Sequence, residues 1–363
     1  MTAESVGPLD DLVVVPPEWL ERTTTAVFTA VGFTEQDAAL IADSLVESDL
    51  RGLRSHGVLL VPIYVERLNA GGVSRARELS VVHDTGAVLH TDAKHGMGQL
   101  SSTHAMRLAV ERAGRFGVGV VVVRHGHHFG AAGRWARQAA EAGCLGVAMS
   151  NTTPLMPGPG GADRIVGNNP MAFAVPTNEA PIVLDMALST VALGKIRLAA
   201  AAGRPIPPDW ATDGDGLPTT DAQTALLGML LPAGGYKGFG LALMVDVLTG
   251  VLGDGGWGEQ VGSLYREPGR FNNCSHLFLA MDPGLLGGRA GFRARASALA
   301  AQVRGSEVVP GAEKPHLPGE AEAEHAAWQR EHGIAVERSA VEALLRTAAA
   351  TGAPVTDPPI EGN

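Results

Sequence analysis

The spacing of apolar residues in the first part of the chain predicts helices. Apolar side chains recur at the three- and four-residue intervals that put them on one face of a helix. This stripe consists of Ala38, Ile41, Ala42, Leu45 and Val46. Thr34 precedes the stripe and Asp37 follows three residues later, a pattern typical of a helix N-terminus. An earlier helix is expected to begin at Pro16-Pro17 and to end near Gly32.

The pattern then changes to short runs rich in β-branched residues, which are typical of strands. Strands are predicted over 79–83, 87–91, 118–123, 145–149, 171–175, 182–184 and 276–281. Helices are predicted over 100–115, 130–143, 189–202, 238–252, 292–303, 320–331 and 336–350. Because strands and helices do not alternate regularly, these elements favour an α+β fold with a mixed, largely antiparallel sheet.

Composition narrows the class of protein. The 363 residues are 45% hydrophobic and 18% charged, which is typical of a globular enzyme-sized chain. The net charge of −10 argues against a surface that binds the phosphate groups of nucleic acids. Cys144 and Cys274 are the two cysteines, both in apolar sequence, so neither a disulfide framework nor a cysteine zinc site is expected. We expect a cytoplasmic protein without a membrane partner, because Met1–Asp11 lacks the features of a secretion signal and the apolar runs are short.

Two histidine-containing stretches are the first candidates for chemistry. Arg54-Ser55-His56-Gly57 follows a predicted helix end, and His127-His128-Phe129-Gly130 follows a predicted strand. Imidazole titrates near neutral pH and therefore suits proton transfer. Taken alone, either histidine could equally be a structural residue.

The familiar nucleotide-binding motifs are absent. No GxGxxG follows a predicted strand and no GxxxxGK[ST] occurs. Gly235-Tyr236-Lys237-Gly238 opens a predicted helix, where backbone N–H groups and one ammonium would suit a phosphate. A tight helix-entry turn is the alternative reading. Asp185 ends a predicted strand and could orient an imidazole, although a strand-end turn would also explain it.

His125-Gly126-His127-His128 supports a second class of function. Closely spaced histidines can bind a metal, so a metal-dependent hydrolase built on His125, His127 and His128 is an alternative. Such sites need further ligands nearby, and the next aspartate is Asp163. We therefore expect no metal.

Many short motifs occur in one order along the chain. They include Asp49-Leu50-Arg51-Gly52, Ser55-His56-Gly57-Val58, Tyr64-Val65, His128-Phe129-Gly130, Ser150-Asn151, Leu184-Asp185-Met186-Ala187, Gly234-Gly235-Tyr236-Lys237-Gly238 and Pro318-Gly319-Glu320. Together they make the chain resemble the type-2 malate/L-lactate dehydrogenase family of NAD(P)-dependent oxidoreductases, from about residue 49 to residue 334. Relatives in this family include ureidoglycolate dehydrogenases and cyclic imino-acid reductases.

The resemblance implies a fold and an activity. It implies a fold other than the Rossmann fold, with a helical domain from both chain ends, residues 1–76 and 305–363. Residues 77–304 would form the cofactor and substrate domain, which a boundary within 125–185 could divide further. The implied protein is a homodimer that transfers hydride between NADH or NADPH and a small molecule, a 2-oxo acid or a cyclic imino acid.

The resemblance also assigns roles to single residues. His56 matches a proton donor, with Ser55 and Asp185 as its supports, and His128 matches a proton acceptor. The residues that match cofactor contacts are Thr152, Val183, Leu184, Asp185, Met186, Ala187, Ser189, Tyr236, Lys237, Gly319 and Glu320. The expected substrate contacts are Leu60, Tyr64 and Asn168.

The chain departs from the family pattern at positions that concern the substrate. Leu60 stands where the family has an arginine for the substrate carboxylate, and Asn168 replaces a threonine. We therefore expect an atypical substrate with a C=N or C=O group, and Leu60 as its specificity position. An ordinary 2-oxo acid bound by another cation is the alternative, and a non-catalytic relative is a third reading. The candidate cations are Arg54, Arg134 and Arg164.

Overall fold

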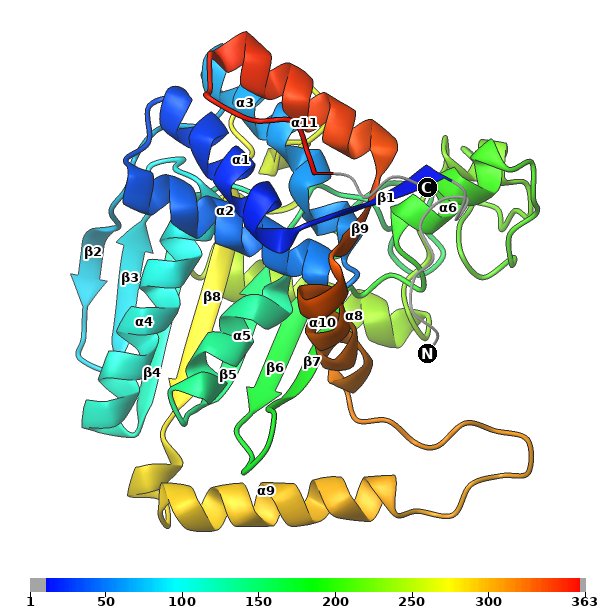
Figure 1. Cartoon of the computed structure of the whole chain (residues 1–363). Coiled ribbons are helices and arrows are strands. Elements are labelled where there is room, and N and C mark those ends of the chain that lie inside the picture. The colour runs from blue at the N-terminus through cyan, green and yellow to red at the C-terminus, as the bar shows by residue number, and fades with distance from the viewer. Residues whose placement is uncertain (1–10, 360–363) are drawn as a thin grey trace.

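A seven-stranded mixed sheet forms the centre of the computed structural model, which describes residues 11–359 (Figure 1). The strand order is β2-β3-β4-β8-β5-β6-β7, and every neighbouring pair is antiparallel except β3 and β4. The strands are β2 (Ser80–Asp84), β3 (Val88–Asp92), β4 (Val118–Gly126), β5 (Leu145–Ser150), β6 (Met171–Val175), β7 (Ile182–Met186) and β8 (Cys274–Met281). The expected mixed, largely antiparallel sheet is thus confirmed.

Two helices cover one face of this sheet, α4 (Gly98–Phe116) and α5 (Ala132–Glu141). Their inner faces are rich in alanine, which lets each helix lie close to the strands. Phe129, Trp135 and Phe278 supply the bulk of this core. The loops that lead into α4 and α5 are therefore connected to helices that pack closely on the sheet.

A helical layer lies above the sheet in Figure 1 and draws on both ends of the chain. Its helices are α1 (Pro17–Ala30), α2 (Glu35–Leu50), α3 (Val61–Ala70) and α11 (Arg338–Thr351). A two-stranded antiparallel ladder joins β1 (Leu12–Val15) to β9 (Ile334–Glu337). This ladder explains why the two ends share one core, which contains Trp19, Leu45, Val336 and Leu344.

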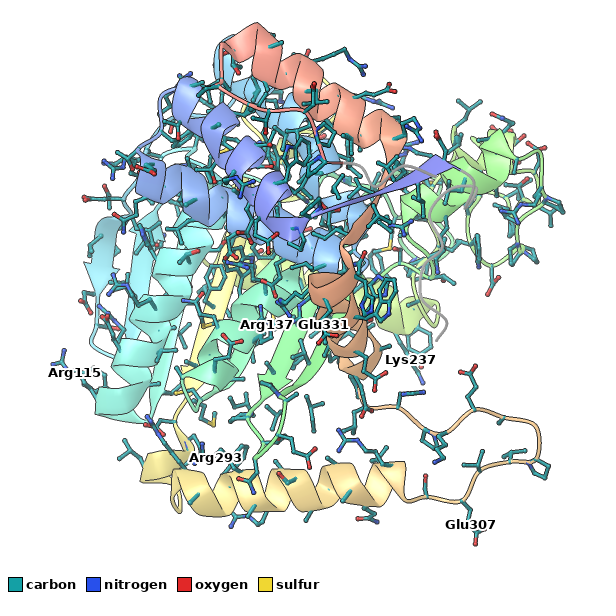
Figure 2. All side chains as sticks on the ribbon, viewed as in Figure 1. Arg115, Arg137, Lys237, Arg293, Glu307 and Glu331 are labelled. Atoms are coloured by element: carbon teal, nitrogen blue, oxygen red, sulfur yellow. The ribbon has the colours of Figure 1, made fainter. Side chains whose placement is uncertain are left out.

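A third apolar cluster lies on the segment between β5 and β8. It contains α6 (Leu193–Ala201), α7 (Ala222–Ala225) and α8 (Tyr236–Asp246), which continues into a π-helical turn, Val247–Val251. The remaining helices are α9 (Arg289–Arg304), which crosses below the sheet in Figure 1, and α10 (Glu320–His332), beside β7. Figure 2 places Arg293 on α9, Glu307 on the loop after it and Lys237 at the start of α8.

Three local expectations were wrong. The sequence did not reveal β1 or β9, because each is only four residues long and is defined by its partner from the other chain end. The helix expected from residue 189 begins at Leu193, since Ser189 first pairs with Pro232. The single helix expected over 238–252 begins at Tyr236 and changes to π-helical geometry at Val247. The acidic start expected at Met1–Asp11 lies, except for Asp11, outside the described residues.

Candidate active site

The turn that carries His56 is held by a buried aspartate. Arg54–His56 is a 3₁₀ turn between α2 and α3. The Oδ2 atom of Asp49, near the end of α2, accepts a hydrogen bond of 2.8 Å from the backbone N–H of Val58. A Cβ atom at Gly57 would lie 1.8 Å from Oδ1 of Asp49, so this position requires glycine. Burial raises the pKa of Asp49 to about 8.

His56 lies against His128, which comes from the loop between β4 and α5. The two rings stack with centroids 5.6 Å apart and planes inclined by 22°. The Ser55 hydroxyl lies 2.9 Å from Nδ1 of His56, as expected if it supports that ring. The tertiary structure thus brings together the two histidine stretches, which the sequence keeps far apart.

A buried hydrogen-bonded chain holds the far side of His128. Its Nδ1 atom lies 2.7 Å from the hydroxyl of Tyr64 on α3, and Nε2 of Gln99 on α4 donates to that hydroxyl at 3.2 Å. The backbone N–H of His128 donates to Oδ1 of Asn272 at 2.9 Å. Burial, with a smaller contribution from the imidazoles of His56 and His276, lowers the pKa of His128 to about 3. His128 is therefore uncharged at neutral pH.

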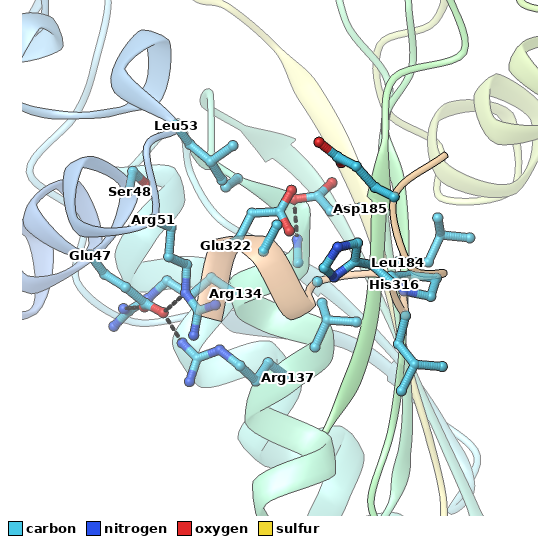
Figure 3. Close-up of a pocket in the computed structure, with 18 residues that line it drawn as sticks. Glu47, Ser48, Arg51, Leu53, Arg134, Arg137, Leu184, Asp185, His316 and Glu322 are labelled. Carbon is cyan, nitrogen blue, oxygen red and sulfur yellow. Dashed lines mark hydrogen bonds and ion pairs between the residues drawn. The ribbon is translucent and has the colours of Figure 1, made fainter. Parts of the chain in front are cut away.

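A cavity of about 700 Å³ opens beside these loops (Figure 3). It reaches the His56 turn through Leu53 and the His128 loop through Ala131. Further lining comes from α2 and its C-terminal end, α5, β7, the segment before α10 and the first turn of α10: Glu47, Ser48, Arg51, Gly133, Arg134, Arg137, Val183, Leu184, Asp185, Glu313, His316, Leu317, Pro318, Gly319, Ala321 and Glu322. This size is in the range of small-molecule and cofactor sites.

Asp185 points into the cavity from β7 (Figure 3). Its Oδ2 atom accepts a hydrogen bond of 2.7 Å from the backbone N–H of Gly133, in the first turn of α5. Although the side chain is open to the cavity, desolvation raises the pKa of Asp185 to about 6, and the negative charge of Glu322 adds to the effect. The hydrogen bond from Gly133 opposes this shift. Its pairing with His56 stays a prediction.

Three arginines surround Glu47 on the opposite wall (Figure 3). Glu47 pairs with Arg51 at 2.8 Å and also with Arg134 and Arg137. Burial opposes ionisation of Glu47, but the guanidinium groups of Arg134, Arg137 and Arg51 outweigh it and lower its pKa. Asp43 also pairs with Arg134 and Glu141 with Arg137, so this wall is a network of paired charges.

The expected cofactor contacts follow the edge strand β7. Val183, Leu184, Asp185 and Gly319 line the cavity, and the N–H of Val183 donates to the carbonyl of Pro318 at 3.0 Å. Glu320 begins α10, where it pairs with Arg304 and accepts a hydrogen bond from the N–H of Leu317.

The other expected cofactor contacts gather at the far end of β7. Leu188 hydrogen-bonds to Asn168 and Ala233, and Thr152 donates to Oδ1 of Asn168 at 2.9 Å. These contacts place the last group near one another: Thr152, Met186, Ala187, Ser189, Tyr236 and Lys237. Tyr236 and Lys237 are exposed at the N-terminus of α8, outside the cavity.

Two expected substrate contacts, Leu60 and Tyr64, are buried, and their role stays a prediction. Leu60 is 0% exposed and packs in the core of the helical layer, so it presents no surface to a substrate. Tyr64 is also fully buried, and its hydroxyl contacts His128 instead. Asn168 is half-buried beside Thr152. Sequence reasoning missed Gln99 and Asn272, because no motif marks them.

The three alternative cations lie in different parts of the structure. Arg134 pairs with Asp43 and Glu47. Arg164 donates to the backbone carbonyls of Leu227 and Gly228. Arg54 lies in the same turn as His56.

The three histidines of the hydrolase reading face different surroundings. Nδ1 of His125 lies 3.0 Å from Asp92, while His127 is buried with its ring against Tyr64. Within residues 11–359, no three His, Cys, Asp or Glu side chains are grouped as metal ligands. This placement does not favour a metal-dependent hydrolase.

Comparison with known proteins assigns the chain to a family. The family model of malate/L-lactate dehydrogenase matches residues 15–345. The chain belongs to this family. As a member, it is an oxidoreductase whose relatives use nicotinamide dinucleotides. It is 34% identical to a malate dehydrogenase of Pyrococcus horikoshii over 351 residues, which cover 94% of this chain and 97% of that one.

Two further relatives carry their cofactor in their names. A (2R)-3-sulfolactate dehydrogenase (NADP(+)) of Chromohalobacter salexigens is 38% identical over 264 residues, 72% of this chain and 79% of that one. A ureidoglycolate dehydrogenase (NAD(+)) of Escherichia coli K12 is 36% identical over 293 residues, 80% of this chain and 82% of that one. The cofactor expectation of NADH or NADPH is thereby confirmed, without a choice between the two.

Solved structures in the family share the fold. The malate dehydrogenase of Pyrococcus horikoshii OT3 superposes with a TM-score of 0.89 at 32% identity, covering 98% of this chain and 100% of that one. The delta1-piperideine-2-carboxylate reductase of Pseudomonas syringae superposes with a TM-score of 0.83 at 29% identity, covering 92% and 99%. Across the described part of the chain, no helix is long and apolar enough to cross a membrane.

The contact between Gly57 and Asp49 yields a first prediction. Gly57→Ala should lower the free energy of unfolding by about 1–3 kcal/mol, because the added methyl group overlaps the Asp49 carboxylate. It should also reduce turnover, because the turn carries His56. Urea unfolding and steady-state rates would measure both effects. Gly114→Ala is the control, since its Cβ would meet nothing within 4 Å; equal effects in the two variants would contradict the prediction.

The position of Leu60 yields a second prediction. Leu60→Arg should lower the free energy of unfolding by about 3 kcal/mol or more, because a guanidinium would be buried among apolar side chains. Leu60→Met should cost less than about 1.5 kcal/mol. Leu217→Arg, at a side chain that is 64% exposed, should be nearly neutral. A stable Leu60→Arg protein with improved turnover of 2-oxo acids would restore Leu60 as a substrate contact.

Proposed function

We propose that the protein transfers hydride between NAD(P) and the C=O or C=N group of a small substrate, with His56 as proton donor. One observation carries this proposal: the stacked pair His56 and His128 belongs to two loops that contribute Leu53 and Ala131 to the lining of the cavity, which β7 and Gly319 also line. Histidine pairs suit proton transfer near neutral pH. The cavity offers room for the molecules that exchange the hydride.

The residues around the cavity fit a dinucleotide. Asp185 offers a carboxylate oxygen for a ribose hydroxyl, while Arg51, Arg134 and Arg137 line the opposite wall in ion pairs with Glu47. At the far end of β7, the N-terminus of α8 bears exposed Lys237, a suitable position for a phosphate group. When bound, the nicotinamide supplies or accepts the hydride.

In this proposal, His56 completes the reaction. Hydride addition to C=O or C=N leaves negative charge on oxygen or nitrogen, which requires a proton. Because the Ser55 hydroxyl contacts Nδ1 of His56, the ring is held while Nε2 can deliver that proton. His128 is uncharged at neutral pH, since its pKa is lowered to about 3, and is therefore a poor proton donor.

The substrate class follows from relatives and from the missing arginine. Relatives are named for malate, sulfolactate and ureidoglycolate, and one solved structure for piperideine-2-carboxylate. These substrates share a carboxylate or a similar acid group. Position 60 carries no cation here, whereas Arg54 shares the turn of His56. We propose a small oxo or imino compound whose acid group, if present, meets Arg54.

A second copy of the chain is the proposed partner. The helix α8 and the π-helical turn after it expose a continuous apolar face: Leu241, Met244, Leu248, Val251 and Leu252. Exposed apolar patches of this kind mark protein–protein contacts. The same helix begins at Tyr236 and Lys237, so a dimer contact here would lie next to the proposed phosphate position.

The histidine assignment can be tested by substitution. His56→Ala should lower kcat about 100-fold or more, the usual size of general acid catalysis, with cofactor affinity retained. Asp185→Asn should also lower turnover. Activity would be followed as NADPH and NADH oxidation with a panel of 2-oxo acids and cyclic imines. His83→Ala, at an exposed position on β2, is the control. Full activity of His56→Ala at neutral pH would refute the assignment.

The dimer can be tested by charge. Leu248→Glu should shift the mass measured by light scattering toward that of one chain, because a carboxylate would be placed in the apolar face of α8. Leu217→Glu, at an exposed position on a different segment, should leave the mass unchanged. A wild-type protein with the mass of one chain at micromolar concentration would contradict the proposal.

A further inference from the structure

The chain of buried groups behind His128 restricts where its proton can lie. Gln99 and Tyr64 are both 0% exposed. Nε2 of Gln99 donates to the Tyr64 oxygen at 3.2 Å, and the same oxygen lies 2.7 Å from Nδ1 of His128. Three side chains from α4, α3 and the loop after β4 are thus connected in series.

Counting the hydrogens of these three side chains shows which group donates each hydrogen bond. The amide nitrogen of Gln99 can only donate, and a tyrosine hydroxyl has a single hydrogen. Tyr64 accepts from Gln99, and among the described residues His128 is the one other hydrogen-bond partner of its hydroxyl. If Nδ1 donated instead, the buried hydroxyl hydrogen would have no acceptor, so it is directed to Nδ1. The proton of neutral His128 then lies on Nε2.

The opposite series of hydrogen bonds, in which His128 donates to Tyr64 and Tyr64 to Gln99, would require the amide of Gln99 to be rotated. Its carbonyl oxygen, which has no partner among the described residues, would then accept from Tyr64. Both hydrogens of the amide nitrogen would be left buried in place of that oxygen. Unpaired buried N–H groups are rarer than under-satisfied carbonyls, so the observed orientation is favoured.

We propose that Gln99 and Tyr64 are positioning residues that fix His128 as the Nε2–H tautomer, which makes His128 a hydrogen-bond donor to the reacting oxygen or nitrogen of the substrate. This inference rests on the proposed function. It differs from the role of proton acceptor that the family resemblance implies for His128. A ring whose Nδ1 is occupied by Tyr64 and whose Nε2 carries hydrogen has no free lone pair.

The surroundings keep His128 in this neutral form. Burial is the main cause that lowers the pKa of His128, and the imidazoles of His56 and His276 add to it. The neighbouring His127 is also held neutral, because burial and the charge of Arg67 lower its pKa. No carboxylate is among the groups that shift the pKa of His128.

The two histidines then divide the chemistry. In reduction, hydride from the cofactor adds to the substrate carbon, and the π electrons of the C=O or C=N bond move to oxygen or nitrogen. That atom takes a proton from His56, which solvent later reprotonates. His128 donates a hydrogen bond throughout and keeps its proton, stabilising the charge as it develops.

The tautomer can be read directly, without activity, by ¹⁵N NMR of the full chain labelled at histidine. The His128 signals are identified by their absence in His128→Gln. At neutral pH, Nε2 should show a protonated, pyrrole-type shift and Nδ1 an unprotonated, pyridine-type shift. The reverse assignment in the wild-type protein would overturn the inference.

Substitutions in the hydrogen-bonded series of Gln99, Tyr64 and His128 test the consequence of a fixed tautomer. Tyr64→Phe removes the donor to Nδ1, so His128 should become a mixture of tautomers. The kcat of this variant should fall about tenfold, the effect expected for the loss of one hydrogen bond. The Kd of the cofactor should stay unchanged. Gln99→Glu should reverse the chain, because a carboxylate accepts from Tyr64, and should give the Nδ1–H tautomer. Tyr265→Phe removes an exposed hydroxyl and is the control.

The outcomes separate this inference from the proposed function. An Nε2–H tautomer without NAD(P)-linked turnover of any oxo acid or imine would refute the proposed function and the donor role together, while the positioning by Tyr64 would stand. Turnover with an Nδ1–H tautomer would refute the inference alone. If Tyr64→Phe does not fold, the wild-type spectrum still decides.

Discussion

The hydrogen bond between Tyr64 and His128 joins the two halves of the molecule at the candidate active site. Tyr64 belongs to the helical layer, and His128 leaves the central sheet. Because both groups are removed from water, leaving either unpaired would cost more than an exposed contact of the same geometry. The relative position of helical layer and sheet therefore decides whether His56 can stack on His128.

The surrounding packing makes this contact rigid. Asp49 fixes the backbone after His56, and Asn272 fixes the backbone of His128. Gly57 leaves space for the Asp49 carboxylate, so the turn and its anchor are in direct contact. The backbone at each histidine is thus held by a group of its own layer, while Tyr64 of the helical layer contacts the ring of His128.

Electrostatics distinguish groups of the same type within the site. Asp185 in the cavity has a pKa raised to about 6, whereas the pKa of Glu47 on the opposite wall is lowered by three arginines. One carboxylate can therefore exchange a proton near neutral pH, and the other is a fixed charge. This separation arises from desolvation without a cationic partner in one case and from close guanidinium groups in the other.

The sequence by itself determined the class of fold, the family and most strand positions. Short runs of β-branched residues are local signals, and β2 and β3 form within one residue of where these runs predict them. It also identified His56, His128 and Asp185 as candidate site residues, because each lies in a short motif that can be recognised without the structure. Only the tertiary structure decided which of these groups meet. Leu60 and Tyr64 stand next to the His56 motif in sequence, yet both are buried, because α3 turns that side toward the core. Gln99 and the β1–β9 ladder depend on contacts between distant segments, which no local pattern encodes.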